Sequence, residues 1–181
     1  MDTRFWGPSG WKILHIITYG YPTKPKLEDK QNYGLFFNSL KYILPCKYCR
    51  ISLDKFYKQL PVEEHLESQN TLTLWIYNIH NKVNNKLRKQ GLLKTKNPKK
   101  TEVDKMYAPL IKTPCRIPGW DFIYCMIFNF PKDKTSLSFD RLNGYITFFT
   151  YIGKVVPCKE YSKEFIEVIK HDPFENNINS N

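Results

Sequence analysis

The sequence contains no apolar run of the roughly 18 residues that a membrane-spanning helix needs, so we expect no transmembrane segment. It also opens without a secretory signal, because Met1-Asp2-Thr3-Arg4 leads into an amphipathic stretch that Gly7, Pro8 and Gly10 interrupt. These two absences predict a soluble protein that is made in the cytosol. With 181 residues, the chain is long enough to bury a hydrophobic core that is stable without disulfide bonds.

Cysteine occurs five times, and one pair alone, Cys46 and Cys49, has the Cys-x-x-Cys spacing. In a cytosolic protein this usage favours redox or metal chemistry over a structural disulfide framework. A structural zinc site needs four ligands, usually two such pairs or one pair with two histidines. His65 and His80 are available, but no second cysteine pair has zinc-finger spacing. We therefore expect no metal site.

No stretch reads clearly as a β-strand, which excludes a thioredoxin fold, because that fold needs βαβ units around its cysteine pair. Apolar residues instead recur at helical spacing. Helices are predicted in the first half at residues 11–21, 31–44, 46–60 and 71–90. Ser9 is expected to cap the first helix and Pro22 to end it. The predicted fold class is all-α.

Basic residues outnumber acidic ones, and the net charge is +11. Much of this charge is local, because one run of cations has no acid between its members: Lys86, Arg88, Lys89, Lys94, Lys96, Lys99 and Lys100. A solvated helix end and a linker explain the run most simply, although some of these cations can face a diphosphate. Neither an aromatic-interleaved sheet nor a helix-turn-helix pattern is present, so nucleic acid is an unlikely partner. A basic helical nucleic-acid-binding or packaging protein without redox activity is the alternative function.

The Cys46–Cys49 pair lies at the start of a predicted helix, because Pro45 suits a first helical turn. Such a pair can form a local disulfide, share a metal or pass electrons. Unpaired N–H groups and the helix dipole favour a thiolate at Cys46, and Lys47 and Arg50 add positive potential. Cys46 is therefore predicted to be the more acidic and more exposed thiol.

Two predicted helices each present a face of aromatic or polar residues. The first carries three residues at intervals of four, which share one face: Trp11, His15 and Tyr19. Taken alone, these residues fit a buried helix face on which the histidine forms a hydrogen bond within the core. On the last predicted helix His80 and Asn84 share a face that Asn81 borders. Because Asn and His are not favoured in mid-helix, this face is predicted to meet solvent or a polar ligand.

The second half of the chain repeats the first. Residues 120–131 match residues 11–22 at an offset of 109, and residues 145–159 match residues 33–47 at an offset of 112. The copy lacks the candidate chemistry, because three positions differ: Tyr124 replaces His15, Phe128 replaces Tyr19 and Tyr161 replaces Cys49. The predicted organisation is a first domain at 1–90, a linker at 91–117, a degenerate helical copy at 118–171 and a disordered tail at 172–181.

Three motifs of the first domain point to one family: Trp6-Gly7-Pro8-Ser9-Gly10-Trp11-Lys12-Ile13-Leu14-His15 with Tyr19, Cys46-Lys47-Tyr48-Cys49, and Trp75 followed by His80-Asn81-Lys82-Val83-Asn84-Asn85-Lys86-Leu87 and Lys89. Over residues 5–89, about half of the chain, this pattern resembles the FAD-linked sulfhydryl oxidases of the Erv/ALR family. The resemblance implies an all-α protein with a four-helix FAD-binding bundle, followed here by a partial degenerate helical repeat.

The resemblance also implies an enzyme that forms disulfide bonds in thioredoxin-like or other dithiol protein substrates. Electrons would pass from the dithiol through Cys46 and Cys49 to FAD and then to O2, giving H2O2. Cys46 and Cys49 are then the catalytic residues. The implied cofactor-binding residues are Gly7, Trp11, His15, Tyr19, Trp75, His80, Asn81, Val83, Asn84, Leu87 and Lys89.

The sequence departs from the family pattern at two aromatic positions. Tyr77 stands where the family commonly has one cysteine of a structural disulfide, and Tyr107 is expected to stand in for a closing tryptophan. The remaining cysteines can form a shuttle disulfide but are expected to be inert: Cys115, Cys125 and Cys158.

Catalytic bundles of this family usually pair as dimers. The second half of this chain is therefore expected to replace a dimer partner, and a homodimer is the alternative. Short chains of this type resemble the oxidases of large cytoplasmic DNA viruses. That resemblance predicts a location in the host cytoplasm or the virion.

Overall fold

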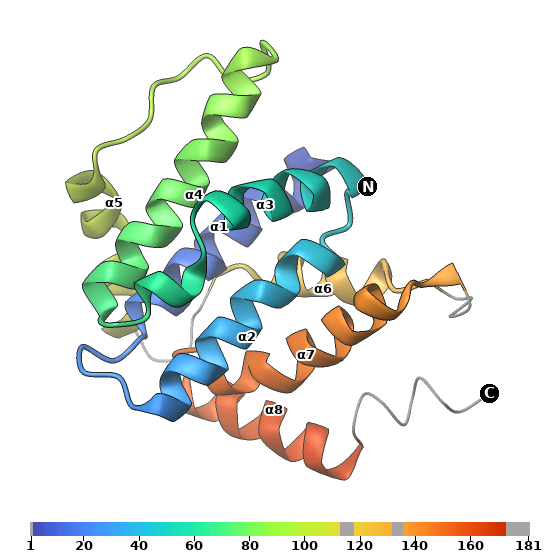
Figure 1. Cartoon of the computed structure of the whole chain (residues 1–181). Coiled ribbons are helices and arrows are strands. Elements are labelled where there is room, and N and C mark those ends of the chain that lie inside the picture. Colours follow the sequence, from blue (N-terminus) through green and yellow to red (C-terminus); the bar gives the residue numbers. More distant parts are fainter. Residues whose placement is uncertain (1, 113–117, 132–135, 173–181) are drawn as a thin grey trace.

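The computed structural model describes residues 2–112, 118–131 and 136–172, and every regular element within these ranges is a helix (Figure 1). The prediction of an all-α fold is confirmed. No helix among the described residues is long and apolar enough to cross a membrane. The predicted disordered tail lies outside the described residues, apart from Asp172, which caps the last helix.

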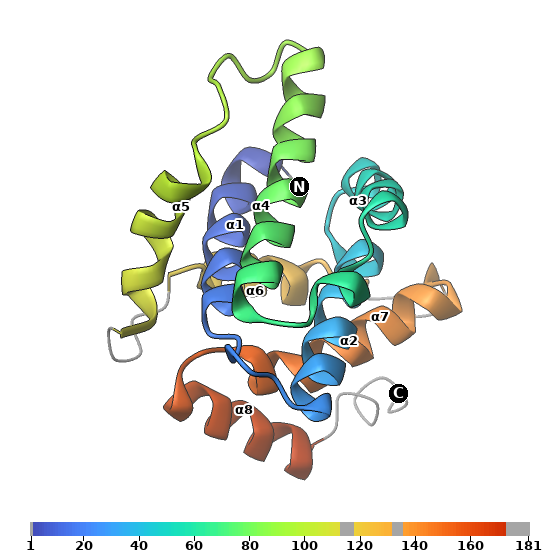
Figure 2. The same cartoon turned by 60° about the vertical axis from the view of Figure 1, so that its left-hand side comes forward.

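Four helices build the first half: α1 (Thr3–Tyr19), α2 (Leu27–Ile43), α3 (Lys47–Gln59) and α4 (Gln69–Lys89). A short 3₁₀ helix, η1 (Val62–His65), links the last two. Each helix turns an apolar face inward. Trp75 of α4 is fully buried at the centre, where its ring packs against Phe37 and Tyr57. In Figure 2, α1 lies beside α4, and α3 lies on the side of α4 away from α5.

The first helix begins eight residues before the position predicted from the sequence. Asp2 is its N-cap, with a carboxylate oxygen accepting the Arg4 N–H at 2.9 Å. Pro8 therefore lies inside α1, where the missing N–H removes one helical hydrogen bond. Burial of Trp6 against Phe122 holds this extension on the molecule, with 5.9 Å between the ring centroids. The prediction of Ser9 as N-cap is wrong, because tertiary packing outweighs the local signal.

The predicted linker at 91–117 is also corrected, because helices occupy much of its second half. These are α5 (Lys100–Tyr107) and the 3₁₀ helix η2 (Ala108–Lys112), and α5 packs against α1 and α4. Gly91 ends α4 by adopting φ +72°, a left-handed conformation that suits glycine. The segment that follows is tied to α4, since Tyr77 donates a hydrogen bond to the Pro98 carbonyl at 2.9 Å and Arg88 donates to the Thr95 carbonyl at 2.8 Å. Residues 100–112 therefore pack against helices of the first half.

The second half contains α6 (Trp120–Phe128), α7 (Phe139–Val155) and α8 (Lys159–His171). Both ends of α7 and of α8 equal those of α2 and α3 shifted by 112 residues. The first residue before α8, Cys158, caps it through sulfur just as Cys46 caps α3, accepting the Tyr161 N–H at 3.4 Å. The offset read from the sequence is therefore also an offset between helices.

Corresponding helices of the two halves pack on each other, α7 against α2 and α6 against α1 (Figure 1). Phe36 and Phe148, which match at the 112 offset, stack with 5.4 Å between ring centroids. Glycines allow the close approach: a Cβ at Gly10 would lie 2.8 Å from the Phe122 ring, and one at Gly144 would lie 2.6 Å from Tyr42. The two halves consequently share one continuous core.

Candidate active site

The two cysteines of the Cys-x-x-Cys pair lie at the N-terminus of α3. Cys46 is the N-cap residue, one position before the helical turn in which the sequence had placed it, and its sulfur accepts the Cys49 N–H at 3.3 Å. Both are free thiols and both are half-buried. Arg50 donates to the Leu44 carbonyl at 2.6 Å and so fixes the corner between α2 and α3.

The environment shifts the pKa values of the two thiols in opposite directions. Burial acts to raise the pKa of Cys46, but hydrogen bonds from the Cys49 side chain and from backbone N–H groups outweigh it, and the pKa falls below its usual value. Burial and the neighbouring Cys46 raise the pKa of Cys49 to about 12. The charge of Lys86 favours the thiolate form of both. The directions of both shifts agree with the prediction that Cys46 is the more acidic thiol.

An aromatic and histidine cluster lies between α1 and α4. The ring of Trp11 stacks on His80 with 3.9 Å between centroids and 8° between planes. Nε2 of His15 lies 3.1 Å from Nδ1 of His80, a hydrogen bond in which one ring nitrogen donates and the other accepts. The structure thus brings the polar face of α4 onto the Trp11–His15–Tyr19 face of α1, a contact that the two separate sequence patterns did not specify.

Helix α5 closes this cluster from one side. Tyr107 stacks on His15 with 4.6 Å between ring centroids and 3° between planes. Tyr19 donates its hydroxyl proton to Asp104, and Lys100 forms an ion pair with the same carboxylate. Lys100 and Asp104 had not been predicted as site residues, because the sequence around them was assigned to a linker. The spacing of Val103 and Tyr107, both buried, was the available signal.

Both histidines of the cluster are held neutral. Burial lowers the pKa of His15 to about 3, and the neighbouring His80 contributes further. Burial also lowers the pKa of His80 to about 4. Nδ1 of His15 is buried and has no hydrogen-bond partner among the described residues. An unpartnered buried nitrogen is costly in an apolar setting, so this atom fits a polar group of a bound ligand.

Further predicted cofactor residues lie around this cluster on the same two helices. On α4 they are half-buried side chains: Asn81, Val83, Asn84 and Leu87. On α1, a Cβ at Gly7 would meet nothing within 4 Å, so the backbone there is open to a neighbouring group. Flat aromatic rings, amide donors and an unpartnered imidazole nitrogen together fit a large planar ligand such as FAD.

Two predicted cofactor residues lie elsewhere. Trp75 is 0% exposed, and its ring N–H donates to the Leu60 carbonyl at 2.9 Å, so it serves the core. Lys89 is exposed near the end of α4 and lies roughly half a turn around the helix from His80. The structure therefore separates both side chains from the histidine cluster. Cys115 lies outside the described residues, Cys125 is a buried free thiol, and Cys158 is disulfide-bonded.

We predict that acid weakens the fold through the two neutral histidines. Their pKa values are depressed in the folded state, so the unfolded chain binds protons first as the pH falls below about 6.5. Their contribution to stability is complete above that pH and is lost as the pH falls to about 4 for His80 and to about 3 for His15. The free energy of unfolding should fall by roughly 1.4 kcal/mol per pH unit for each histidine.

Urea unfolding between pH 7 and 4.5 measures this slope. His80→Asn should reduce it by about half, because one of the two titrating groups is removed. His171→Asn, at an exposed position at the end of α8, should leave it unchanged. A stability that stays constant over this pH range would contradict the assignment.

Comparison with known sequences agrees with this geometry. A sequence profile described as the Erv1 / Alr family matches residues 8–106, more than half of the chain. The chain is 42% identical over 85 residues to a protein of Acanthamoeba polyphaga mimivirus named as a probable FAD-linked sulfhydryl oxidase, a match covering 46% of this chain and 59% of that protein. It is 34% identical over 88 residues to the mitochondrial FAD-linked sulfhydryl oxidase of Saccharomyces cerevisiae, covering 49% and 46%.

The chain thus spans about half the length of the curated relatives it matches. The matched region runs from α1 through most of α5 and includes both cysteines and the histidine cluster. From the extent of this match, the chain belongs to the Erv1 / Alr family.

Proposed function

We propose that this protein is an FAD-dependent thiol oxidase that forms disulfide bonds in dithiol substrates. The observation that supports this most strongly is the pair of cysteines at the start of α3, whose pKa values are shifted in opposite directions. Perturbed thiols at a helix N-terminus are typical of redox sites. The relatives named as FAD-linked sulfhydryl oxidases support the same activity.

The exchange chemistry follows from the two acidities. In the oxidised pair, a substrate thiolate attacks the Cys46 sulfur, the Cys46–Cys49 bond breaks, and Cys49 leaves as a thiolate. The second substrate thiolate then attacks the substrate sulfur of the mixed disulfide and releases Cys46. The low pKa of Cys46 makes it a good leaving group in this second step. The charge of Lys86 partly offsets the cost of releasing the less acidic Cys49.

Electron balance requires an acceptor beside the reduced pair. FAD, when bound, would supply the acceptor for the two electrons of the Cys46–Cys49 dithiol, with O2 as the final acceptor reduced to H2O2. Overall, the substrate dithiol loses two electrons and two protons. The side chains of His15, His80 and Asn84 would hold the cofactor, with Tyr107 and α5 keeping water from the histidines. Thioredoxin-like or other dithiol proteins are the proposed substrates, and the cytoplasmic location stays a prediction.

The purified full-length protein tests this proposal through its visible spectrum and its oxygen uptake on dithiothreitol. We expect bound oxidised flavin and uptake that Cys49→Ser reduces to the rate without enzyme while the flavin remains bound. Cys125→Ala, which alters a free thiol on α6, should keep both flavin and uptake.

The opposite result would be a folded, colourless protein that consumes no oxygen with thiols. Salt-dependent binding of that protein to DNA would then favour the alternative, a basic nucleic-acid-binding function.

We further propose that the second half replaces a dimer partner within one chain. The pairing of α2 with α7 and of α1 with α6 supports this, because each contact joins elements that match at a constant sequence offset. Such pairing has the arrangement of an isologous dimer interface. The C-terminal copy would then act as a scaffold that needs no redox residues.

Light scattering on the purified protein tests this arrangement. A chain whose own second half covers its dimer face should be a monomer of 21.6 kDa at micromolar concentration. A stable particle of twice that mass would favour the homodimer instead.

A further inference from the structure

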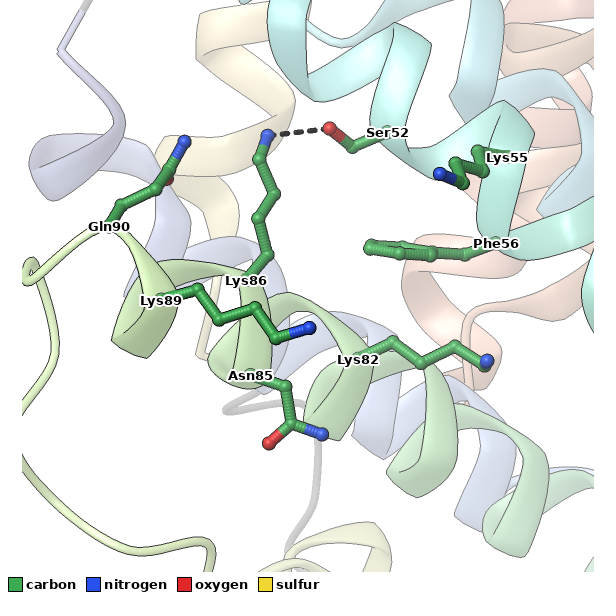
Figure 3. A pocket seen from close by; sticks show the side chains of 8 residues that line it. All are labelled: Ser52, Lys55, Phe56, Lys82, Asn85, Lys86, Lys89 and Gln90. Carbon is green, nitrogen blue, oxygen red and sulfur yellow. Dashed lines mark hydrogen bonds between the residues drawn. The ribbon is translucent and has the colours of Figure 1, made fainter.

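A cavity outside the histidine cluster lies between α3 and α4. It has a volume of about 460 Å³, within the range of ligand sites, and Figure 3 shows the side chains around it. From α3 come Ser52, Lys55 and Phe56. From α4 and the residue after it come Lys82, Asn85, Lys86, Lys89 and Gln90. We call this cavity the lysine groove.

The lysine groove is strongly basic. Four of its eight lining residues are lysines, and no carboxylate lines it. Within the described part of the chain, none of these lysines forms an ion pair. Lys82 instead donates to Gln59 at 2.9 Å and lies 6.0 Å from the centre of the Phe56 ring. Cations gathered in a cleft raise the local concentration of anionic partners.

The lysine groove faces away from the histidine cluster. At 100° per residue, Lys82 and Lys86 lie roughly 200° and 240° around α4 from His80. Lys86 reaches Ser52 of α3 (Figure 3), and Lys82 reaches Gln59 of the same helix. His80 instead stacks on Trp11 of α1. The groove and the histidine cluster therefore use different sides of the same helix.

The groove is nevertheless connected to the cysteines. Lys86 donates to the Ser52 hydroxyl at 2.5 Å, and Ser52 lies three residues after Cys49 on α3. The Lys86 charge also acts on both sulfurs. Beside Cys46 and outside the groove, Tyr48 is 74% exposed and Ile51 is 58% exposed. A chain bound in the groove would therefore lie next to the reactive pair.

We propose that the lysine groove docks an acidic segment of the dithiol protein substrate. This inference rests on the proposed oxidase function and adds a substrate class to it. Carboxylates of the segment would meet Lys55, Lys82 and Lys89, while its apolar atoms cover Phe56. The substrate cysteines, placed near these acids in sequence, would then reach Cys46. Selection among dithiol proteins would come from charge complementarity and not from the thiol chemistry itself.

The test uses the flavin-loaded full-length protein and two synthetic Cys-x-x-Cys peptides of equal length. One peptide carries Asp and Glu around the cysteines, and the other carries Asn and Gln at the same positions. The kcat/KM for oxygen uptake on each peptide is divided by the value for dithiothreitol with the same variant. The variant Lys55→Gln with Lys82→Gln removes two groove charges. Lys24→Gln with Lys26→Gln removes two exposed charges in the loop before α2 as a control.

We expect the wild type to prefer the acidic peptide at low salt. The groove variant should lose at least about fivefold of that preference, since each surface charge contributes modestly, and the control should retain it. Raising the salt should weaken the preference of the wild type. Equal use of both peptides, or an equal loss in both double variants, would overturn the docking proposal while leaving the oxidase function intact.

A binding measurement separates this proposal from the proposed function. A fluorescent acidic peptide with Ser in place of both Cys needs no redox activity to bind. If no dithiol is oxidised, the oxidase function fails, and anisotropy of this peptide alone decides whether the groove holds acidic chains. Binding to the wild type and control, but not to the groove variant, supports the groove. Tighter binding of a single-stranded oligonucleotide than of the peptide at 150 mM salt would overturn it.

Discussion

The hydrogen bond from the Cys49 N–H to the Cys46 sulfur fixes the geometry on which the rest of the site depends. It makes Cys46 the N-cap of α3, so the Cys46 sulfur lies among the unpaired N–H groups of the first turn. Cys49 lies about one turn further along the helix. Hydrogen bonds at this cap lower the pKa of Cys46, and burial together with the neighbouring Cys46 raises the pKa of Cys49, so two chemically identical thiols differ in acidity. At the matching position of the second half, Cys158 caps α8 in the same way, but Tyr161 stands where the second thiol would be. The cap is thus a property of the fold, and the chemistry depends on the residue three positions later.

The histidine cluster is closed without a covalent link among the contacts described at α5. Tyr107 stacks on His15, Asp104 joins Tyr19 to Lys100, and Tyr77 holds the connecting segment through the Pro98 carbonyl. The Tyr77 hydroxyl thus ties the segment that leads into α5 to helix α4 by a hydrogen bond. Because such contacts do not respond to thiols, this closure would persist while substrate dithiols react nearby. Burial keeps the two histidines neutral, which makes the same closure sensitive to acid.

Much of this arrangement could be predicted from the sequence. Helical periodicity located α2, α3 and α4 to within a few residues, and the 112-residue offset anticipated the bounds of α7 and α8. The start of α1 and the whole of α5 were not predicted, because the sequence signals for a helix are weak there. Pro8 and two glycines suggested a later start for α1, but burial of Trp6 outweighs them, and α5 lies in a lysine-rich stretch with few apolar residues. The directions of individual side chains could not be predicted from the sequence. Trp75 and Lys89 belong to the motif that carries the family resemblance, yet Trp75 points into the core and Lys89 lines the lysine groove.

The start of α3 gives Cys46 and Cys49 different acidities. Alkylation of the reduced protein by iodoacetamide, followed residue by residue with mass spectrometry from pH 6 to 11, tests it most directly. Cys46 should react with a midpoint below that of an ordinary thiol, because its pKa is lowered. Cys49 should stay largely unmodified throughout, because its pKa is raised to about 12. Equal midpoints for the two residues, or a lower midpoint for Cys49, would contradict the account.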